Sequence, residues 1–151
     1  MRVRFQLTVD SEGWPPVSSE RLWAEPLGDD KFRIDNTPWF VRNLATEDVV
    51  RALAGSGGVL WAVERVQWSG RLTIRVIPRR DGPLAADREA VLDAFNPYGV
   101  SAEGVEQYGM VALDVPPDSD LRAIKTLLKA GEGDGRWHFE EGCISDEWAA
   151  A

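Results

Sequence analysis

The sequence has 151 residues, of which 44% are hydrophobic and seven are tryptophan, so it can form a packed core in one domain or in two very small ones. Its formal charge of −8 disfavours nucleic-acid phosphates and anionic lipid surfaces and makes a basic partner the better electrostatic match. The single cysteine, Cys143, excludes an intramolecular disulfide framework. With only one histidine in the chain, no ligand set for a structural zinc remains.

The N-terminal nine residues alternate polar and apolar side chains, whereas a signal peptide would have a continuous apolar run. No later segment has the length needed to cross a bilayer. We therefore expect a protein of the reducing cytoplasm that is neither secreted nor inserted into a membrane. The sequence does not define its oligomeric state.

Residues 1–69 show short strand patterns separated by turn residues. The pattern predicts strands over residues 2–9, 21–27, 31–35 and 59–67, a short apolar run over 39–41 that could close a sheet, and a turn followed by a short strand after Thr46. Gly28-Asp29-Asp30 predicts a tight turn between the second and third strands. This arrangement predicts a small SH3-like β-barrel over residues 1–69.

Residues 70–151 have a different pattern, in which strands alternate with helices. We expect strands over 71–77, 104–108, 110–115 and 136–140, a helix over 87–95, and a second helix capped by Asp118 or Ser119 and ended by Gly131. An acidic tail with Trp148 follows. The order β-α-β-β-α-β predicts a ferredoxin-like plait, so the fold class is α+β with two parts.

The tryptophans are expected to differ in burial. Trp23, Trp39 and Trp61 lie in apolar strand contexts and are expected in the core or in interdomain packing. Trp14 and Trp148, beside prolines and in the acidic tail, are expected to be exposed, where a tryptophan can act as a binding anchor. Alternatively, either one folds back onto the body of the protein.

Several segments resemble a known family. Trp23-Ala24-Glu25-Pro26-Leu27, Ile34-Asp35-Asn36-Thr37-Pro38-Trp39-Phe40 and Asp48-Val49-Val50 resemble, in that order, motifs of a bacterial family of small proteins known only as a domain of unknown function. The resemblance covers most of the chain. It implies a shared fold and no activity.

The sequence predicts no catalytic residue, no metal site and no cofactor. His138 and Cys143 could approach each other if the chain turned at Gly142, but a working pair also needs an orienting acid and an oxyanion hole. Carboxylate pairs are too common in this acidic chain to single out a general acid and base. The glycine runs at 55–58 and 131–135 are not followed by the lysine and helix of a phosphate-binding loop.

The candidate binding surface is one face of the second sheet. If Leu72 and its alternate neighbours pack under the helices, Arg71 and Arg75 point the other way, and by the same alternation Arg136 and His138 do so on the last strand. Such a face could bind a carboxylate or a phosphate through bidentate guanidinium groups. Alternatively, these residues solvate the face, pair with Asp114 and Glu140, or are covered by the barrel. The outward positions lack the aromatic residues on which RNA-recognition modules stack bases, which further disfavours nucleic acid.

Three functions remain open. The first is a non-enzymatic interaction protein whose acidic surface neutralises or regulates a basic protein partner, as an immunity protein or antitoxin does. The second is a regulatory module that senses a small anionic molecule over Arg71, Arg75 and Arg136. The third is an enzyme that uses His138 or Cys143 in a deep pocket. Fold alone cannot choose among them, because small barrels and plaits both carry unrelated functions.

Overall fold

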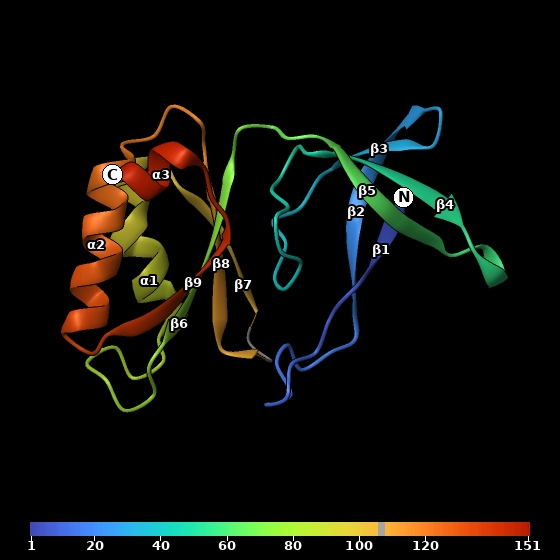
Figure 1. The fold of residues 1–151 in the computed structure, drawn as a ribbon. Coiled ribbons are helices and arrows are strands. Elements are labelled where there is room, and N and C mark those ends of the chain that lie inside the picture. The colour runs from blue at the N-terminus through green and yellow to red at the C-terminus, as the bar shows by residue number, and fades with distance from the viewer. Residues whose placement is uncertain (106–107) are drawn as a thin grey trace. The chain divides into compact units, whose positions relative to one another are not determined.

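The computed structural model describes residues 1–105 and 108–151 and divides into two compact units, residues 1–69 and 70–151 (Figure 1). We call them the barrel unit and the α+β unit. The boundary falls between Ser69 and Gly70, where the pattern of the sequence changes from strands and turns to strands and helices.

The barrel unit is a closed barrel of five strands that follow one another in sequence order. The strands are β1 (Arg2–Gln6), β2 (Ser19–Gly28), β3 (Lys31–Ile34), β4 (Val49–Ala54) and β5 (Leu60–Gln67), with a 3₁₀ turn η1 (Ser56–Gly58) between the last two. Consecutive strands pair antiparallel, and β5 meets β1 in parallel at the single pair Arg4 and Trp61. The prediction that the N-terminal residues form a small β-barrel is therefore confirmed.

Alternate residues of the strands fill the barrel interior. The buried core consists of Val3, Phe5, Leu22, Ala24, Phe32, Ile34, Leu44, Val50 and Ala52. Because Leu22 and Ala24 point inward, Trp23 between them points outward and is 49% exposed. The prediction that Trp23 is a core residue is therefore wrong, although the alternation of β2 contains the information needed to place it.

The segment 39–41 is a bend and not a strand, contrary to the prediction. The carboxylate of the buried Glu20 accepts hydrogen bonds from the backbone N–H groups of Trp39, Phe40 and Val41 at 2.7 to 3.0 Å. Backbone donors inside a protein need an acceptor, and here a side chain supplies what a neighbouring strand would otherwise supply. One glutamate thus fixes this loop to β2.

A second buried carboxylate, that of Asp48, holds the end of the same loop. It accepts hydrogen bonds from the backbone N–H groups of Ala45 at 2.9 Å and Ser69 at 2.8 Å, and Arg65 Nη1 lies 3.4 Å from it. A buried charge is tolerated when it is paired and hydrogen-bonded, as this one is. The chain turns at Thr46 and then enters β4, which confirms the predicted turn and short strand.

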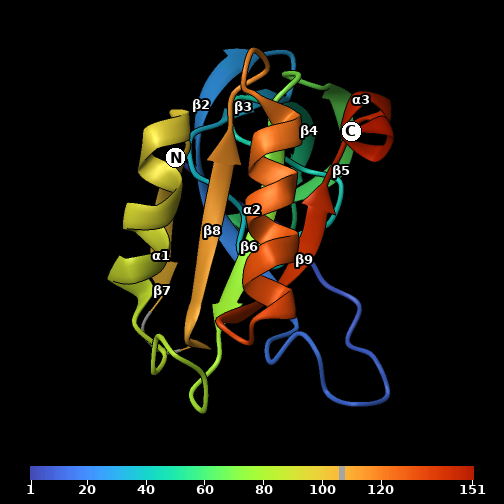
Figure 2. The same ribbon diagram turned by 90° about the vertical axis from the view of Figure 1, so that its left-hand side faces the viewer.

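The α+β unit has the chain order β-α-β-β-α-β and one antiparallel sheet with strand order β7-β8-β6-β9. Figure 2 shows α1 and α2 on the same face of this sheet. The elements are β6 (Leu72–Pro78), α1 (Arg88–Phe95), η2 (Asn96–Tyr98), β7 (Ser101–Val105), β8 (Met110–Val115), α2 (Leu121–Gly133), β9 (Trp137–Cys143) and α3 (Asp146–Ala150). The predicted strand 104–108 lies partly outside the described residues, and β7 already begins at Ser101.

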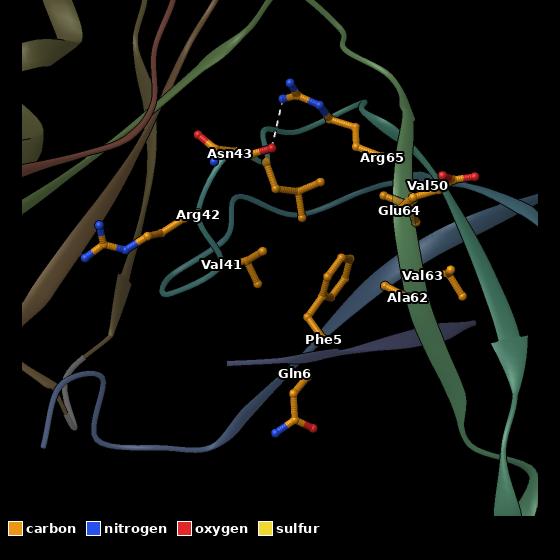
Figure 3. A pocket seen from close by; sticks show the side chains of 11 residues that line it. Phe5, Gln6, Val41, Arg42, Asn43, Val50, Ala62, Val63, Glu64 and Arg65 are labelled. Atoms are coloured by element: carbon orange, nitrogen blue, oxygen red, sulfur yellow. Dashed lines mark hydrogen bonds between the residues drawn. The ribbon is translucent and has the colours of Figure 1, made fainter. Parts of the chain in front are cut away.

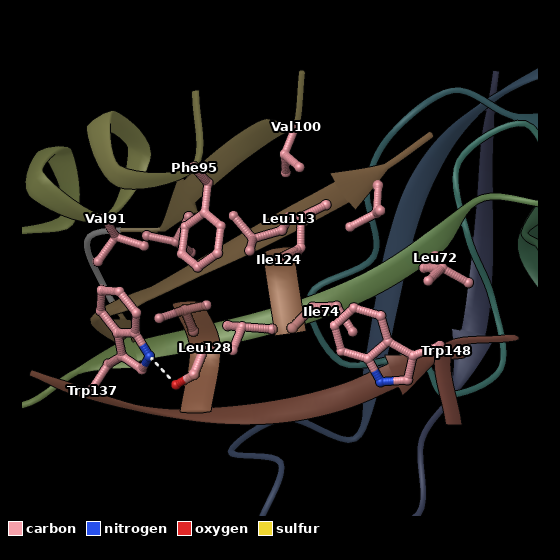
Figure 4. Close-up of a cluster of buried hydrophobic side chains, with 13 residues drawn as sticks. Leu72, Ile74, Val91, Phe95, Val100, Leu113, Ile124, Leu128, Trp137 and Trp148 are labelled. Carbon is pink, nitrogen blue, oxygen red and sulfur yellow. Dashed lines mark hydrogen bonds between the residues drawn. The ribbon is translucent and has the colours of Figure 1, made fainter. Parts of the chain in front are cut away.

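The core of the α+β unit lies between the sheet and the two helices (Figure 4). Leu72, Ile74 and Val76 of β6 are buried in it, as predicted. Trp137 is fully buried and its Nε1 donates a hydrogen bond to the carbonyl of Leu128 at 3.0 Å. At Gly131 of α2, a Cβ atom would overlap the Trp137 ring, so only glycine lets this helix approach the indole.

The helix boundaries are partly as predicted. Asp87 caps α1 by accepting from the N–H groups of the first turn. Asp120 caps α2, not Asp118 or Ser119, and the helix continues beyond Gly131 to Gly133. Since Asp118, Ser119 and Asp120 are all good cap residues, sequence alone does not choose among them.

The acidic tail folds into the short helix α3, capped by Ser145. Trp148 on this helix is fully buried, and its Nε1 donates a hydrogen bond to the carboxylate of Glu141. The prediction that Trp148 is exposed is wrong, because a helical turn places the indole in the core while the acidic residues before it stay in solvent. Trp14, also expected to be exposed, is half-buried and contacts Phe40 edge to face.

Candidate functional site

Arg75 lies on the predicted face of β6 but is fully buried. It stands opposite Glu140 of β9 and Ala112 of β8, and its Nη1 donates to Glu140 Oε1 at 2.9 Å. At Gly142 of β9, a Cβ atom would overlap the Arg75 guanidinium. The absence of a side chain at Gly142 therefore leaves room for the Arg75 guanidinium.

Arg71 is half-buried and contacts Asp114 of β8 through two nitrogens. Its Nε lies 3.0 Å from Asp114 Oδ1 and its Nη2 lies 3.0 Å from Oδ2, which is the bidentate geometry that favours Arg–carboxylate pairs. Ser101 Oγ also donates to Asp114 Oδ2 at 3.4 Å. The pairing of Arg71 with Asp114 and of Arg75 with Glu140 is the alternative that the sequence left open.

Arg136 lies in the turn before β9 and pairs with Asp134 in the same turn. Arg136 Nε is 2.9 Å from both carboxylate oxygens, and its guanidinium is 4.6 Å from the centroid of the Trp137 ring. The hydrogen bond from Arg136 lowers the pKa of Asp134 below its usual value. Arg136 is therefore placed by its own turn and not by the alternation of a strand.

His138 is exposed and stands opposite Ile77, on the same face of β9 as Glu140. Cys143 is buried at the other end of this strand, which continues through Gly142 without turning back. Five residues of extended strand separate the two side chains by about 16 Å. The structure therefore does not bring His138 and Cys143 together as a nucleophile and base.

Residues 1–105 and 108–151 contain no group of three His, Cys, Asp or Glu side chains arranged to hold a metal ion. None of the helices in those ranges combines the length and apolarity that a membrane span requires.

A groove opens on the barrel unit beside the end of β1 (Figure 3). Its volume is about 500 Å³, including its open mouth, and it is lined by Phe5, Gln6, Val41, Arg42, Asn43, Leu44, Val50, Ala62, Val63, Glu64 and Arg65. Arg65 Nη1 donates to the Asn43 carbonyl at 2.8 Å across one end. The groove follows from the pairing of β1 with β5 at one position only, beyond which the two strands diverge.

A second basic surface, which was not predicted from the sequence, lies on the outside of the barrel. We call Arg2, Arg4, Arg21, Trp23 and Trp61 the arginine–tryptophan face. The Arg2 guanidinium lies 4.4 Å from the centroid of the Trp23 ring, and that of Arg4 lies 5.6 Å from the centroid of Trp61. The alternation of Arg2 and Arg4 with the buried Val3 and Phe5 was a signal for it, but the cross-strand partners were not predictable.

Comparison with known proteins identifies the fold and the family. A crystal structure of a hypothetical protein from Neisseria gonorrhoeae is similar, with a TM-score of 0.78 and 20% sequence identity over 95% of this chain and 94% of that chain. This likeness shows the fold alone. No curated protein matches the sequence significantly. The family model described as Domain of unknown function (DUF4265) matches residues 20–139, most of the chain, and the protein therefore belongs to this family.

Proposed function

We propose that this protein is a non-enzymatic cytoplasmic binding protein, whose α+β unit neutralises or regulates a basic protein partner as an immunity protein or antitoxin does. The observation that carries this proposal is the excess of exposed acid on the α+β unit. Complementary charge steers a basic partner toward such a surface and disfavours acidic competitors.

The charges of the two units differ. Residues 70–151 contain fifteen acidic and nine basic residues, whereas residues 1–69 contain ten acidic and eight basic residues. Four of the nine bases, Arg71, Arg75, Arg79 and Arg136, already pair with acids of the same unit. Exposed acids on α1 and α3 form no ion pair within the described ranges: Glu89, Asp93, Asp146 and Glu147. The negative excess therefore faces solvent.

We further propose that the barrel unit is SH3-like and the α+β unit a ferredoxin-like plait. The order β9-β6-β8-β7, with all neighbours antiparallel and two helices on one face, supports the second assignment. Neither fold specifies a function. The proposal therefore rests on surface charge.

The experiment is affinity capture by the tagged full-length protein at low and moderate salt. We expect the wild type to recover a basic protein, and the variant E89Q/D93N/D146N/E147Q to lose it. The control variant E12Q/D29N/D30N/D35N removes four exposed acids from the barrel unit and should retain the partner. Recovery of no basic protein, or equal retention by the two variants, would contradict the proposal.

A small anionic ligand is the second candidate, because Arg42 and Arg65 give the barrel groove a basic rim. Arg42 on this rim is exposed and forms no ion pair within the described ranges. In contrast, Arg71 and Arg75 of the predicted sheet site contact acids. In a metabolite thermal-shift screen, at least one anionic compound should raise the melting temperature of the wild type but not that of R42Q. If no compound raises the melting temperature of the wild type, this candidate is excluded.

A further inference from the structure

The arginine–tryptophan face has an arrangement of charge that is unfavourable within the chain. Arg4 of β1 and Arg21 of β2 stand directly opposite each other in the antiparallel ladder, so their side chains leave the same face. Directly opposed residues have Cβ atoms about 5 Å apart, and like charges at that distance destabilise a sheet. The Arg4–Arg21 pair is therefore expected to lower the stability of the free protein.

No acid of the described chain compensates these arginines. Arg2, Arg4 and Arg21 form no ion pair with any residue in 1–105 or 108–151. The Nε of Arg4 is buried and meets no hydrogen-bond acceptor there. The outward residues next to these arginines are uncharged or aromatic: Gln6, Ser19, Trp23 and Trp61. The outward acids Glu25 and Asp35 lie next to Trp23, and neither forms an ion pair with these arginines. The positive charge of Arg2, Arg4 and Arg21 is therefore not neutralised by an ion pair within the described ranges.

The two tryptophans hold the arginines in place. The Arg2 guanidinium lies over Trp23, its direct cross-strand neighbour, and that of Arg4 lies over Trp61 of β5, its neighbour on the other side. A guanidinium stacked on a ring keeps its N–H donors in the guanidinium plane, where they can still bind a carboxylate side-on. Stacking thus reduces the side-chain entropy that an incoming anion would otherwise have to offset.

We propose that the arginine–tryptophan face binds an acidic peptide segment of a protein partner. Arg2 and Arg4 are two residues apart on one strand, about 6.6 Å, and this is also the spacing of side chains at i and i+2 of an extended peptide. An extended peptide with acids at alternate positions along β1 would place one carboxylate at Arg2 and the next between Arg4 and Arg21.

A peptide fits this face better than single-stranded nucleic acid does. Nucleic-acid sites of this kind stack bases on open aromatic rings, whereas arginines here already lie over Trp23 and Trp61. The formal charge of −8 also repels a long polyanion more than a short acidic segment. The inference concerns the barrel unit and does not depend on the function proposed for the acidic α+β unit.

The test uses a fluorescein-labelled peptide, Gly-Glu-Thr-Glu-Thr-Glu-Gly, titrated with the full-length protein and followed by fluorescence anisotropy at low salt. The expected result is saturable binding that weakens as salt is added. The variant R2Q/R4Q/R21Q should bind at least about tenfold more weakly, because three charge-assisted contacts are lost. The control R80Q/R122Q/K129Q removes three exposed positive charges from the α+β unit and should bind like the wild type.

Titrations with other ligands test whether the arginine–tryptophan face prefers nucleic acid or a lipid surface to an acidic peptide. The peptide with Gln in place of Glu should not bind, and neither a ten-residue oligo(dT) nor phosphatidylserine vesicles should bind more tightly than the acidic peptide. Equal weakening by the two triple variants, preference for oligo(dT) or vesicles, or self-association of the wild type that R2Q/R4Q/R21Q abolishes would each overturn the proposal. The variant R2Q/R4Q/R21Q should also still capture the basic partner, because that partner is proposed to bind the α+β unit. The peptide titration and the capture experiment therefore test the two proposals separately.

Discussion

In the α+β unit, Arg71, Arg75 and Arg136 each contact a carboxylate of the same unit. In the barrel unit, Arg2 and Arg4 contact tryptophan rings. Arg71 and Arg75 look like Arg2 and Arg4 in sequence, since each pair lies on one side of an alternating pattern of polar and apolar residues. The difference shows that such alternation does not identify a binding face until the cross-strand neighbours are known.

The comparison also predicts how each arginine group affects stability. An arginine that is buried with its acid is strongly destabilising when the acid alone is removed, because an uncompensated charge stays inside. An arginine that faces another arginine contributes repulsion, so removing it stabilises the free protein. Stability measurements can therefore distinguish arginines that stabilise the fold from arginines that destabilise it.

The largest effect is expected for E140A, which removes an ionic partner of the buried Arg75. We expect it to lower the free energy of unfolding by about 3 kcal/mol, because the guanidinium remains buried. Urea unfolding followed by NMR signals of residues 70–151 measures this. The double variant R75M/E140L should recover most of the loss, and an equally unstable double variant would show that packing and not charge is responsible.

The next effect is expected for G142A. The added methyl group overlaps the Arg75 guanidinium and must displace it from Glu140. Overpacking of this kind should cost about 2 kcal/mol in the same unfolding experiment. G133A is the matched control, because no atom lies within 4 Å of a Cβ at this helical glycine. A loss in G133A as large as that in G142A would contradict the assignment.

D114N tests the half-buried pair. Asparagine keeps the shape of Asp114 but removes the charge that Arg71 contacts through two nitrogens. We expect a loss of about 1 kcal/mol in the free energy of unfolding. E25Q, which breaks the exposed pair of Glu25 and Arg33, should cost less than about 0.5 kcal/mol. Equal losses would mean that burial does not set the strength of these pairs.

The smallest effect is a change in the pKa of Asp134. The hydrogen bond from Arg136 lowers this pKa, so R136Q should raise it toward the usual value for aspartate. A lowered carboxyl pKa contributes stability above the unfolded-state pKa, about pH 4, and this contribution is lost as the pH falls through the folded-state pKa. A carboxyl-carbon NMR titration of both proteins measures the change, and an unchanged pKa would contradict the contact.

Much of the architecture could be predicted from the sequence. The strand-to-helix change near Ser69, the inward side of β6 and the helix start at Asp87 all follow from local patterns. The loop 35–48 was harder to predict, because Glu20 stabilises it from nineteen or more residues away. A loop whose backbone N–H groups bind a distant side chain has no helix or strand periodicity in its own sequence.

The candidate site was less predictable because charge compensation is non-local. Glu140 lies 65 residues beyond Arg75, and only the register of β6 with β9 brings the two together. Similarly, the opposition of Arg4 and Arg21 depends on the register of β1 with β2. Local alternation gives the face on which a side chain lies, whereas register decides its neighbours.

Paired charge reversals measure the difference between the two arginine groups most directly. R71E places a glutamate against Asp114, whereas R21E places one against Arg4. We expect opposite signs in urea unfolding: R71E should lower the free energy of unfolding by about 2 kcal/mol, and R21E should raise it by about 0.5 kcal/mol. A loss in both variants would contradict this expectation, because Arg21 would then stabilise the fold as Arg71 does.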